Sequence, residues 1–209
     1  MERLYKGIHK FQSSHFKRKE EFFRRLSTRQ TPEVLFITCA DSRVDPNLVT
    51  QSRPGDLFII RNVGNIVPPH NAIRDKNSVA AAMEFAVLGL KVTDIIVCGH
   101  SNCGAMQMLR RSEAAFLGMP HLKEWVDIAE PVRRIVERFY PDASDEMKER
   151  ITEKENVLMQ LRNIETYPFV EKALEEGTVR LHGWYYDIGT GRISAYDPET
   201  DAFENVAAS

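Results

Sequence analysis

An imidazole and a thiol stand three residues apart in residues 97–105, Val-Cys-Gly-His-Ser-Asn-Cys-Gly-Ala. His100 and Cys103 follow an apolar run at 95–98 that is typical of a buried strand, and residues 103–109 have the pattern of a helix. We therefore expect both side chains in the crevice beyond the carboxyl end of a strand, where open parallel sheets bind ligands. Their spacing suits metal ligands, but two protein side chains do not hold a zinc ion, so a third ligand must come from elsewhere.

Cys39 is the expected third ligand, because it ends a second apolar run at 34–38. This run predicts a central parallel strand that is buried on both faces. If the strands at 34 and 94 are neighbours in the sheet, Cys39 comes next to His100 and Cys103. Two thiolates and one imidazole leave the fourth tetrahedral position of zinc open to water, and such an ion generates a hydroxide nucleophile at neutral pH. A thiol hydrolase with Cys39 as nucleophile is less favoured, because a thiolate bound to zinc is not free to attack.

Asp41 and Arg43 follow Cys39 by two and four residues, in a turn that would hold them at the metal. The carboxylate can occupy the fourth zinc position, or it can accept a bidentate pair from the guanidinium and leave that position to water. Held by Arg43, it could also accept a proton from the water and orient the resulting hydroxide. The alternative is an ordinary surface turn with a helix cap.

The elements around these residues alternate between strands and helices. A further apolar run at 57–60 predicts a strand, and a helix is expected over 78–88 with Asn77 or Ser78 as its cap. This order predicts an α/β fold, a doubly wound, mostly parallel sheet flanked by helices. Helical patterns at 121–140 and 144–166 are rich in charge, which favours solvated helix faces. A strand at 179–188, a turn at 189–191 and a return at 192–196 predict a C-terminal edge hairpin.

Length and composition favour one domain. The chain has 209 residues, of which 43% are hydrophobic, enough for one sizeable core. We expect a single domain over 1–209, with an N-terminal helical arm at 1–30, a zinc-binding α/β core at 31–110, and helices and the edge hairpin at 111–209. A net charge of -2 gives no general attraction to nucleic acid, and no apolar run approaches the length of a membrane span. A cytoplasmic protein with free thiols is expected, because three cysteines without regular spacing do not form a disulfide framework.

The first thirty residues carry an excess of positive charge and apolar residues at helical spacing, with a break near 12–14. A basic amphipathic arm could lie on a membrane or act as a transit peptide. The favoured alternative is a pair of helices that pack phenylalanines on the body of the protein or on a partner subunit. The apolar face is aromatic, and the acidic residues Glu2, Glu20 and Glu21 argue against a targeting segment.

Three separated blocks together resemble one family. Cys-x-Asp-Ser-Arg at 39–43, Arg-Asn-x-x-Asn at 61–65 and Gly-His-Ser-x-Cys-Gly at 99–104 are similar to the β-class carbonic anhydrases, in particular the plant-like and cyanobacterial branch. The resemblance runs from about residue 30 to the strand at 182–184. It implies reversible hydration of carbon dioxide to bicarbonate and a proton by a zinc-bound hydroxide, with one zinc ion per chain. It also implies a homodimer or higher homo-oligomer in which the N-terminal helix crosses the partner, located in the cytoplasm or, alternatively, in a carboxysome.

The resemblance assigns roles to residues of this chain. It implies zinc ligation by three residues, a catalytic pair that gates and orients the hydroxide, a substrate-binding amide, and an apolar pocket wall with a contribution from the other subunit. These positions are, in that order, Cys39, His100 and Cys103; Asp41 and Arg43; Gln30; and Phe58, Val63 and Phe85.

One position bears on regulation, and one segment bears on turnover. Some members of the family use a tryptophan three residues before the first zinc cysteine, with the arginine of the Arg-Asn pair, to hold a noncatalytic bicarbonate that stabilises an aspartate-ligated inactive form. Here that position is Phe36, so the water-bound form is expected near neutral pH, with Asp41 ligation chemically available at low pH. The segment 70–78 lacks the glycines common in the family, so it is expected to take another path and puts turnover, but not metal binding, in question.

Two other functions stay open on the sequence alone. One is a noncatalytic interaction protein stabilised by zinc on the same scaffold, and the other is a hydrolase of a related substrate such as carbonyl sulfide. The Asp41 and Arg43 pair favours catalysis, because a structural zinc site has no use for it. Cys98 is expected to be a small buried apolar residue, and His70 is a weak candidate for a proton shuttle.

Overall fold

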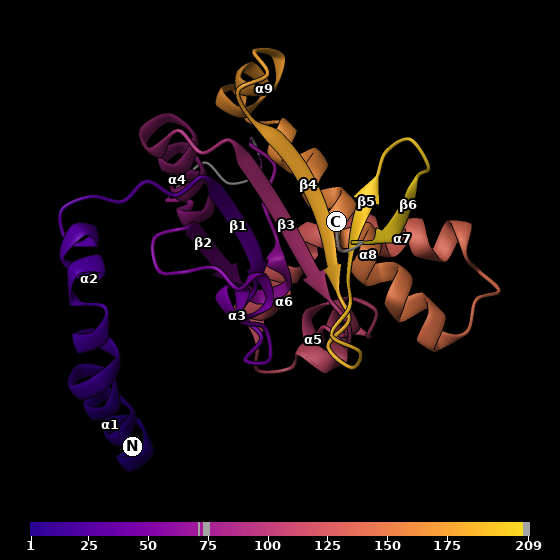
Figure 1. The fold of residues 1–209 in the computed structure, drawn as a ribbon. Helices are drawn as coiled ribbons and strands as arrows, with labels where there is room; N and C mark the ends of the chain where they lie inside the picture. The colour runs from indigo at the N-terminus through magenta and orange to yellow at the C-terminus, as the bar shows by residue number, and fades with distance from the viewer. Residues whose placement is uncertain (71, 73–75, 207–209) are drawn as a thin grey trace.

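The computed structural model describes residues 1–70, 72 and 76–206, and Figure 1 shows their arrangement. The centre of the molecule is a six-stranded sheet in the order β2-β1-β3-β4-β5-β6. The first four strands of the chain are parallel, whereas β5 and β6 are antiparallel to their neighbours. The strands are β1 (Val34–Cys39), β2 (Leu57–Asn62), β3 (Asp94–His100), β4 (Arg180–Tyr186), β5 (Ile193–Asp197) and β6 (Ala202–Asn205).

The strand register brings the expected metal ligands to one edge of the sheet. In the parallel pair β1 and β3, Val34 lies opposite Asp94 and Thr38 lies opposite Cys98. The strands at 34 and 94 are therefore neighbours, as predicted. Their carboxyl ends meet at the lower edge of the sheet in Figure 1, beside α3 and α5, so Cys39 and His100 emerge at the same place.

Helices occupy the connections between strands. The 3-10 helices cover 63–65, 113–116 and 127–129, and two π-helical stretches, Phe11–Phe16 and Phe85–Leu90, continue from α1 and α4. The α-helices are α1 (Glu2–Lys10), α2 (Glu20–Leu26), α3 (Pro46–Thr50), α4 (Ser78–Glu84), α5 (Gly104–Leu109), α6 (Pro120–Val126), α7 (Glu130–Phe139), α8 (Asp145–Glu165) and α9 (Pro168–Glu175).

The structure corrects the single helical pattern expected at 121–140. That segment is two helices, α6 and α7, with a 3-10 turn at 127–129 between them. Pro131 occupies the first turn of α7, where its missing N–H costs nothing, so a new helix begins there. The helix expected at 144–166 is α8, and the Ser144 side chain accepts from the N–H of Met147 at 3.2 Å as its N-cap.

The C-terminal hairpin is present, and a further strand follows it. Strand β4 pairs in parallel with β3 along its whole length, and β5 returns antiparallel to it, with Trp184 opposite Ala195. The additional strand β6 then pairs with β5 and forms the edge of the sheet. The first part of the hairpin therefore lies inside the sheet and does not form its edge.

Successive side chains along each strand point to opposite faces of the sheet, and the two faces differ in their surroundings. Leu35 and Ile37 belong to the main core, which α4, α8 and α9 cover with residues such as Val157 and Ile164. Phe36 points to the other face and clusters with Ile96 and Cys98. Helix α8 lies behind the sheet in Figure 1, and this second face is turned toward the viewer. Around the second cluster lie the half-buried side chains of Val34, Leu57, Ile59, Trp184 and Tyr186.

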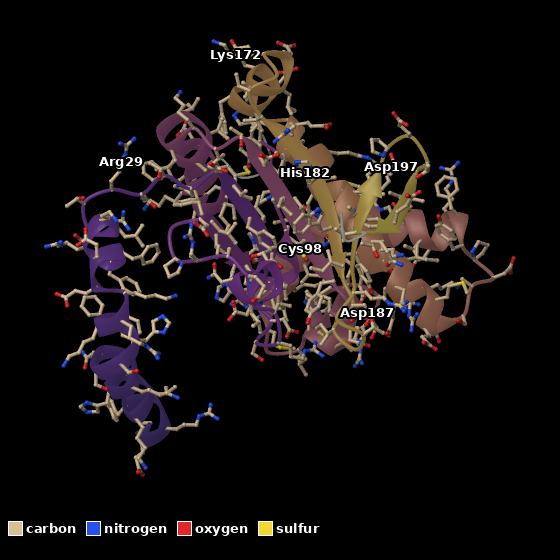
Figure 2. The ribbon with its side chains drawn as sticks, viewed as in Figure 1. Arg29, Cys98, Lys172, His182, Asp187 and Asp197 are labelled. Carbon is tan, nitrogen blue, oxygen red and sulfur yellow. The ribbon has the colours of Figure 1, made fainter. Side chains whose placement is uncertain are left out.

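The N-terminal arm, made of α1, the π-helical stretch and α2, lies to one side of the body (Figure 1). None of its helices contains a buried residue. The arm meets the body at the 53–56 turn, where the Arg53 guanidinium lies 5.8 Å from the centre of the Phe22 ring. Arg29 lies on the linker that leads from the arm to β1 (Figure 2). Within the described residues, no helix combines the length and apolar character that crossing a bilayer requires.

Candidate metal centre and active site

Three side chains converge at the carboxyl edge of the sheet. Cys39 is the last residue of β1, His100 is the last residue of β3, and Cys103 directly precedes α5. Their potential ligand atoms all lie within 4.8 Å of one another, and all three side chains are buried. The structure thus brings together the three predicted metal ligands.

The His100 ring is oriented for ligation. Its Nδ1 lies 3.0 Å from the carbonyl oxygen of Ser101, and because a carbonyl only accepts, this nitrogen carries the proton. The other nitrogen, Nε2, is buried and has no hydrogen-bond partner among the described residues. Buried polar atoms without a partner are rare in folded proteins, and this one belongs to a side chain that lies beside the two thiols.

The two thiols cannot both ionise easily without a cation. Hydrogen bonding with the Cys103 side chain lowers the pKa of Cys39 to about 4, against the opposing effect of burial. The same contact, together with burial, raises the pKa of Cys103. A divalent cation removes this conflict because it binds both sulfurs as thiolates. The unpartnered Nε2 and the paired thiols therefore fit a tetrahedral metal with an N and S donor set, as zinc prefers.

Asp41 and Arg43 form a bidentate ion pair at the rim of this cluster. Arg43 Nε donates to Asp41 Oδ1 at 2.9 Å, and its Nη2 donates to Oδ2 at 2.7 Å. Arg43 is fixed in turn because Nη2 also donates to the carbonyl oxygen of Asn102 at 3.0 Å. The hydrogen bonds from Arg43 hold the pKa of Asp41 well below its usual range, so the carboxylate stays ionised. Its Oδ2 lies 3.9 Å from Nε2 of His100.

Arg61 ties down the backbone between Cys39 and Asp41. Its Nε donates to the carbonyl oxygen of Cys39 at 3.2 Å, and its Nη2 donates to that of Asp41 at 2.7 Å. The backbone that leads from the first expected ligand to the ion pair is therefore anchored to β2 at two points. The sequence contained this arginine within a matching block, but spacing alone did not indicate its contact.

The expected pocket residues are only partly gathered. The rings of Phe58 and Phe85 lie together, with 5.9 Å between their centres. Val63 is 42% exposed, and its carbonyl oxygen accepts from Trp125 Nε1 at 2.7 Å. Gln30 is exposed on the linker before β1. The substrate-binding roles of these four residues remain predictions.

The segment 70–78 lies partly outside the described residues, because 71 and 73–75 are not among them. Its described ends are anchored. His70 N–H donates to Thr166 Oγ1 at 2.9 Å, and the Asn77 side chain accepts from the N–H groups of Val79 and Ala80 as the N-cap of α4. The expected change of path therefore stays a prediction.

Two buried residues lie near the cluster; the sequence predicted the burial of Cys98 but not that of Glu153. Cys98 is 1% exposed, and burial raises its pKa to about 12, so it stays a neutral thiol inside the sheet (Figure 2). The charge pattern of α8 predicts a solvated face for Glu153, yet this residue is 2% exposed and accepts from the N–H of Cys103 at 2.9 Å. A single buried glutamate in a helix rich in exposed charge gives no sequence signal of its own.

Known proteins share this fold and these sequence blocks. A family model described as carbonic anhydrase matches residues 34–193. A carbonic anhydrase of Synechocystis is 44% identical over 197 residues, which cover 94% of this chain and 71% of the relative. Among solved structures, the β-carbonic anhydrase CcaA is 43% identical, with a TM-score of 0.95 and 99% of each chain covered. One of two tetrameric β-carbonic anhydrases from Sordaria macrospora is 27% identical, with a TM-score of 0.81 over 93% of this chain and 95% of its own.

An α/β fold with a Cys₂His cluster at the carboxyl ends of its strands defines a metal-dependent enzyme class. The matches extend over most of the chain, and the chain therefore belongs to the carbonic anhydrase family, in its β class. It is an enzyme of this family, whose reaction is the zinc-dependent, reversible hydration of carbon dioxide. When bound, zinc lowers the pKa of a coordinated water toward neutrality and so supplies a nucleophile, an effect for which carbonic anhydrase is itself the standard example.

Proposed function

We propose that this chain hydrates carbon dioxide reversibly with one zinc ion held by Cys39 Sγ, His100 Nε2 and Cys103 Sγ. The observation that carries the proposal is the buried, unpartnered Nε2 of His100 beside two thiols, with an ion-paired carboxylate at the rim. Three protein ligands match a catalytic zinc site, which keeps one position for reactants, whereas structural sites have four.

Asp41 and Arg43 act as the catalytic pair in this proposal. The two parallel hydrogen bonds from Arg43 fix both oxygens of Asp41, and the Asn102 carbonyl fixes Arg43. Held in this way, the carboxylate does not swing onto the metal. It remains an ionised acceptor that can orient a water molecule at the site and receive a proton from it at Oδ2. This arrangement favours the open form of the site near neutral pH.

The substrate pocket in this proposal is built from apolar side chains that a single chain does not bring to its own ligand cluster, because Phe58 lies opposite Leu35, toward the start of β1. Phe58, Val63 and Phe85 provide an apolar wall, and the Gln30 side-chain amide offers a donor and an acceptor. Carbon dioxide is small and nonpolar, so a wall of this kind concentrates it and excludes competing water. Phe85 and Gln30 are exposed in the single chain, which is consistent with a pocket completed by a second subunit.

The working unit is a homodimer or a higher homo-oligomer. The arm exposes an apolar stripe with Leu4, Ile8 and Phe11 on one helical face, and its helices bury no residue. A second copy of the chain would cover this stripe. The tetramers of the Sordaria relatives support assembly of this kind. A cytoplasmic location, with residence in a carboxysome as the alternative, is a further prediction that cell fractionation would test.

The experiment that tests the catalytic pair is the substitution Asp41→Asn. Asparagine retains the shape but loses the charge and the proton-accepting oxygen, so zinc content should be unchanged while the hydration rate falls by roughly 10²-fold or more. Asp45→Asn is the matched control, because Asp45 lies in the same segment but caps α3, a role that asparagine also fills. Stopped-flow hydration and metal analysis measure both quantities. A D41N enzyme with its rate intact would refute the assignment.

A further inference from the structure

Helix α8 approaches the cluster of Cys39, His100 and Cys103 from behind the sheet. It makes a contact beside each of these three expected ligands. The first contact is made by Glu153. Its Oε1 accepts from the backbone N–H of Cys103 at 2.9 Å, and its Oε2 accepts from the hydroxyl of Tyr185 at 2.7 Å. The carboxyl group is buried, and both of its oxygens are hydrogen-bonded. It therefore fixes the backbone of Cys103, the residue directly before α5.

The second contact is made by Asn156, less than one turn further along α8. Its Nδ2 donates to the carbonyl oxygen of Gly64 at 2.9 Å, and the N–H of Gly64 lies 3.4 Å from Sγ of Cys39. The Asn156 side chain is held in turn by Gln160, whose Nε2 donates to Asn156 Oδ1 at 2.7 Å. Asn156 therefore holds the residue whose backbone N–H donates to the Cys39 sulfur, without touching the cysteine itself.

The conformation of Gly64 makes this arrangement specific. Gly64 has a φ of 78°, in the left-handed region that glycine adopts freely. A Cβ at this position would lie 3.0 Å from Cβ of Ala105 and 3.1 Å from Cε of Met106. Gly64 is thus packed between Cys39 and α5, with its N–H toward the Cys39 sulfur and its carbonyl oxygen held by Asn156.

The third contact lies next to His100. A Cβ at Gly99 would lie 2.7 Å from Cγ2 of Val157 and 3.4 Å from the carbonyl oxygen of Glu153. The backbone of α8 therefore packs directly against β3 one residue before the histidine. Because one rigid helix makes all three contacts, the positions of the three ligands are linked through it.

We propose that α8 sets the geometry and donor strength of the Cys₂His centre, with Glu153 and Asn156 as positioning residues for Cys103 and for the Gly64 donor to Cys39. The inference rests on the proposed function only for the ligand assignment. A hydrogen bond to a metal-bound sulfur withdraws charge from it, and removal of such outer partners typically weakens metal binding by roughly 10–100-fold. Glu153 preserves the position of Cys103, whereas Asn156, through the Gly64 donor, also adjusts the charge on the Cys39 sulfur.

The test compares five single variants of the full chain with wild type. Glu153→Ala removes the acceptor for Cys103, and Glu153→Gln keeps an acceptor oxygen at the same place. Asn156→Ala removes the donor to Gly64, and Asn156→Asp keeps the size but sets an oxygen against that carbonyl. Asn163→Ala is the matched control, because Asn163 is a buried asparagine of the same helix that donates to the Val67 carbonyl at 2.8 Å, away from the ligands.

Two readouts separate positioning from simple stability. The first is the zinc dissociation constant by competition with a chelator, and the second is the sulfur-to-metal charge-transfer absorption of the Co²⁺-substituted protein. E153A, N156A and N156D should bind zinc roughly 10–100-fold more weakly, and E153Q should recover most of the affinity. The absorption should move to lower energy in N156A and N156D, because the Cys39 sulfur becomes more electron-rich. N163A should lose stability in urea without a change in either readout.

Several outcomes would overturn the proposal. Wild-type affinity in N156A, or an equal loss of affinity in N156A and N163A, would reduce α8 to a general structural role. If E153A does not fold, the comparison of N156A with N163A decides the matter. A wild-type protein without zinc would instead refute the proposed function, so the two failures are distinguishable.

Discussion

Two aspartates, Asp41 and Asp94, are each clamped by an arginine at opposite ends of the sheet. Asp94 accepts from Arg180 Nε and Nη2, both at 2.9 Å, and lies 2.8 Å from Nε2 of His182. The hydrogen bonds from Arg180 and His182 hold the pKa of Asp94 well below its usual range. Asp41 lies beside His100 of the ligand cluster, whereas Asp94 joins the starts of β3 and β4, so we expect the same ion-pair chemistry to serve activity at Asp41 and stability at Asp94.

The Asp94 clamp predicts a pH-dependent stability. A carboxyl whose pKa is lower in the folded state contributes stability above its unfolded pKa of about 3.9, and this contribution is lost as the pH falls toward the folded value. Urea unfolding should therefore show Asp94→Asn less stable than wild type at pH 7, with a difference that shrinks below about pH 4. Asp142→Asn, at an exposed position, is the control. A difference that stays constant down to about pH 2.5 would contradict this account.

Residue type and spacing predicted that the side chains of the three expected ligands lie together, because a histidine and a cysteine three residues apart, directly after a buried strand, are typical of a metal site. Cys39, His100 and Cys103 were all recognisable in the sequence, and the structure brings them together. Glu153 and the Gly64 N–H were not recognisable. Their roles depend on how α8 sits against the sheet, which is a property of tertiary packing and leaves no local pattern.

At the scale of elements, α8 packs against β3 and β4 through glycines. Gly99 and Gly183 face Val157 closely enough that an added Cβ would lie 2.7 Å and 3.1 Å from its methyl groups. The absence of a side chain at these two strand positions therefore sets the distance between helix and sheet. Three of the parallel strands were predictable as apolar runs and the fourth as the first strand of a hairpin, but this distance was not predictable.

This close packing predicts that Gly99→Ala lowers the free energy of unfolding by about 1–3 kcal/mol, because the new methyl overpacks the interface. Val157→Ala removes the methyl that it meets. The double variant G99A/V157A should therefore be less destabilised than the sum of the two single variants, as measured by urea unfolding. Strict additivity would show that the strand and the helix do not meet in this way.

Element boundaries were harder to predict than element types. Residues 121–140 looked like one helix because both halves have helical periodicity, yet the chain restarts at Pro131. Helix α9 also begins with a proline, Pro168, and it was not among the predicted elements, although the end expected for the preceding helix, at 166, agrees with the structure. Strand β6 has four residues, too few for a clear alternation.

In the whole molecule, the N-terminal arm exposes apolar side chains that nothing in the single chain covers among the described residues. The stripe of Leu4, Ile8 and Phe11 is exposed, with 56%, 51% and 43% of each residue accessible. Exposed apolar surface of this kind marks an interaction site. The second face of the sheet carries a separate apolar cluster, in which Phe36 is buried and Trp184 is partly buried.

We expect the triple variant L4S/I8S/F11S to lower the mass of the assembly in sedimentation velocity. Wild type should sediment as a dimer or larger species, and the variant should shift toward a monomer with an unchanged circular dichroism spectrum, because the stripe is not buried within its own chain. Leu117→Ser is the control, since Leu117 is 91% exposed and lies outside the arm. An unchanged sedimentation coefficient would remove the arm from the interface.

We propose that Cys39, His100 and Cys103 hold a catalytic zinc ion for carbon dioxide hydration. The most direct test measures zinc content and hydration rate on the same preparations of wild type and Cys39→Ser. We predict one zinc per wild-type chain with rapid hydration, and joint loss of metal and rate in C39S. Stoichiometric zinc in a wild-type protein that does not hydrate carbon dioxide at alkaline pH would contradict the account.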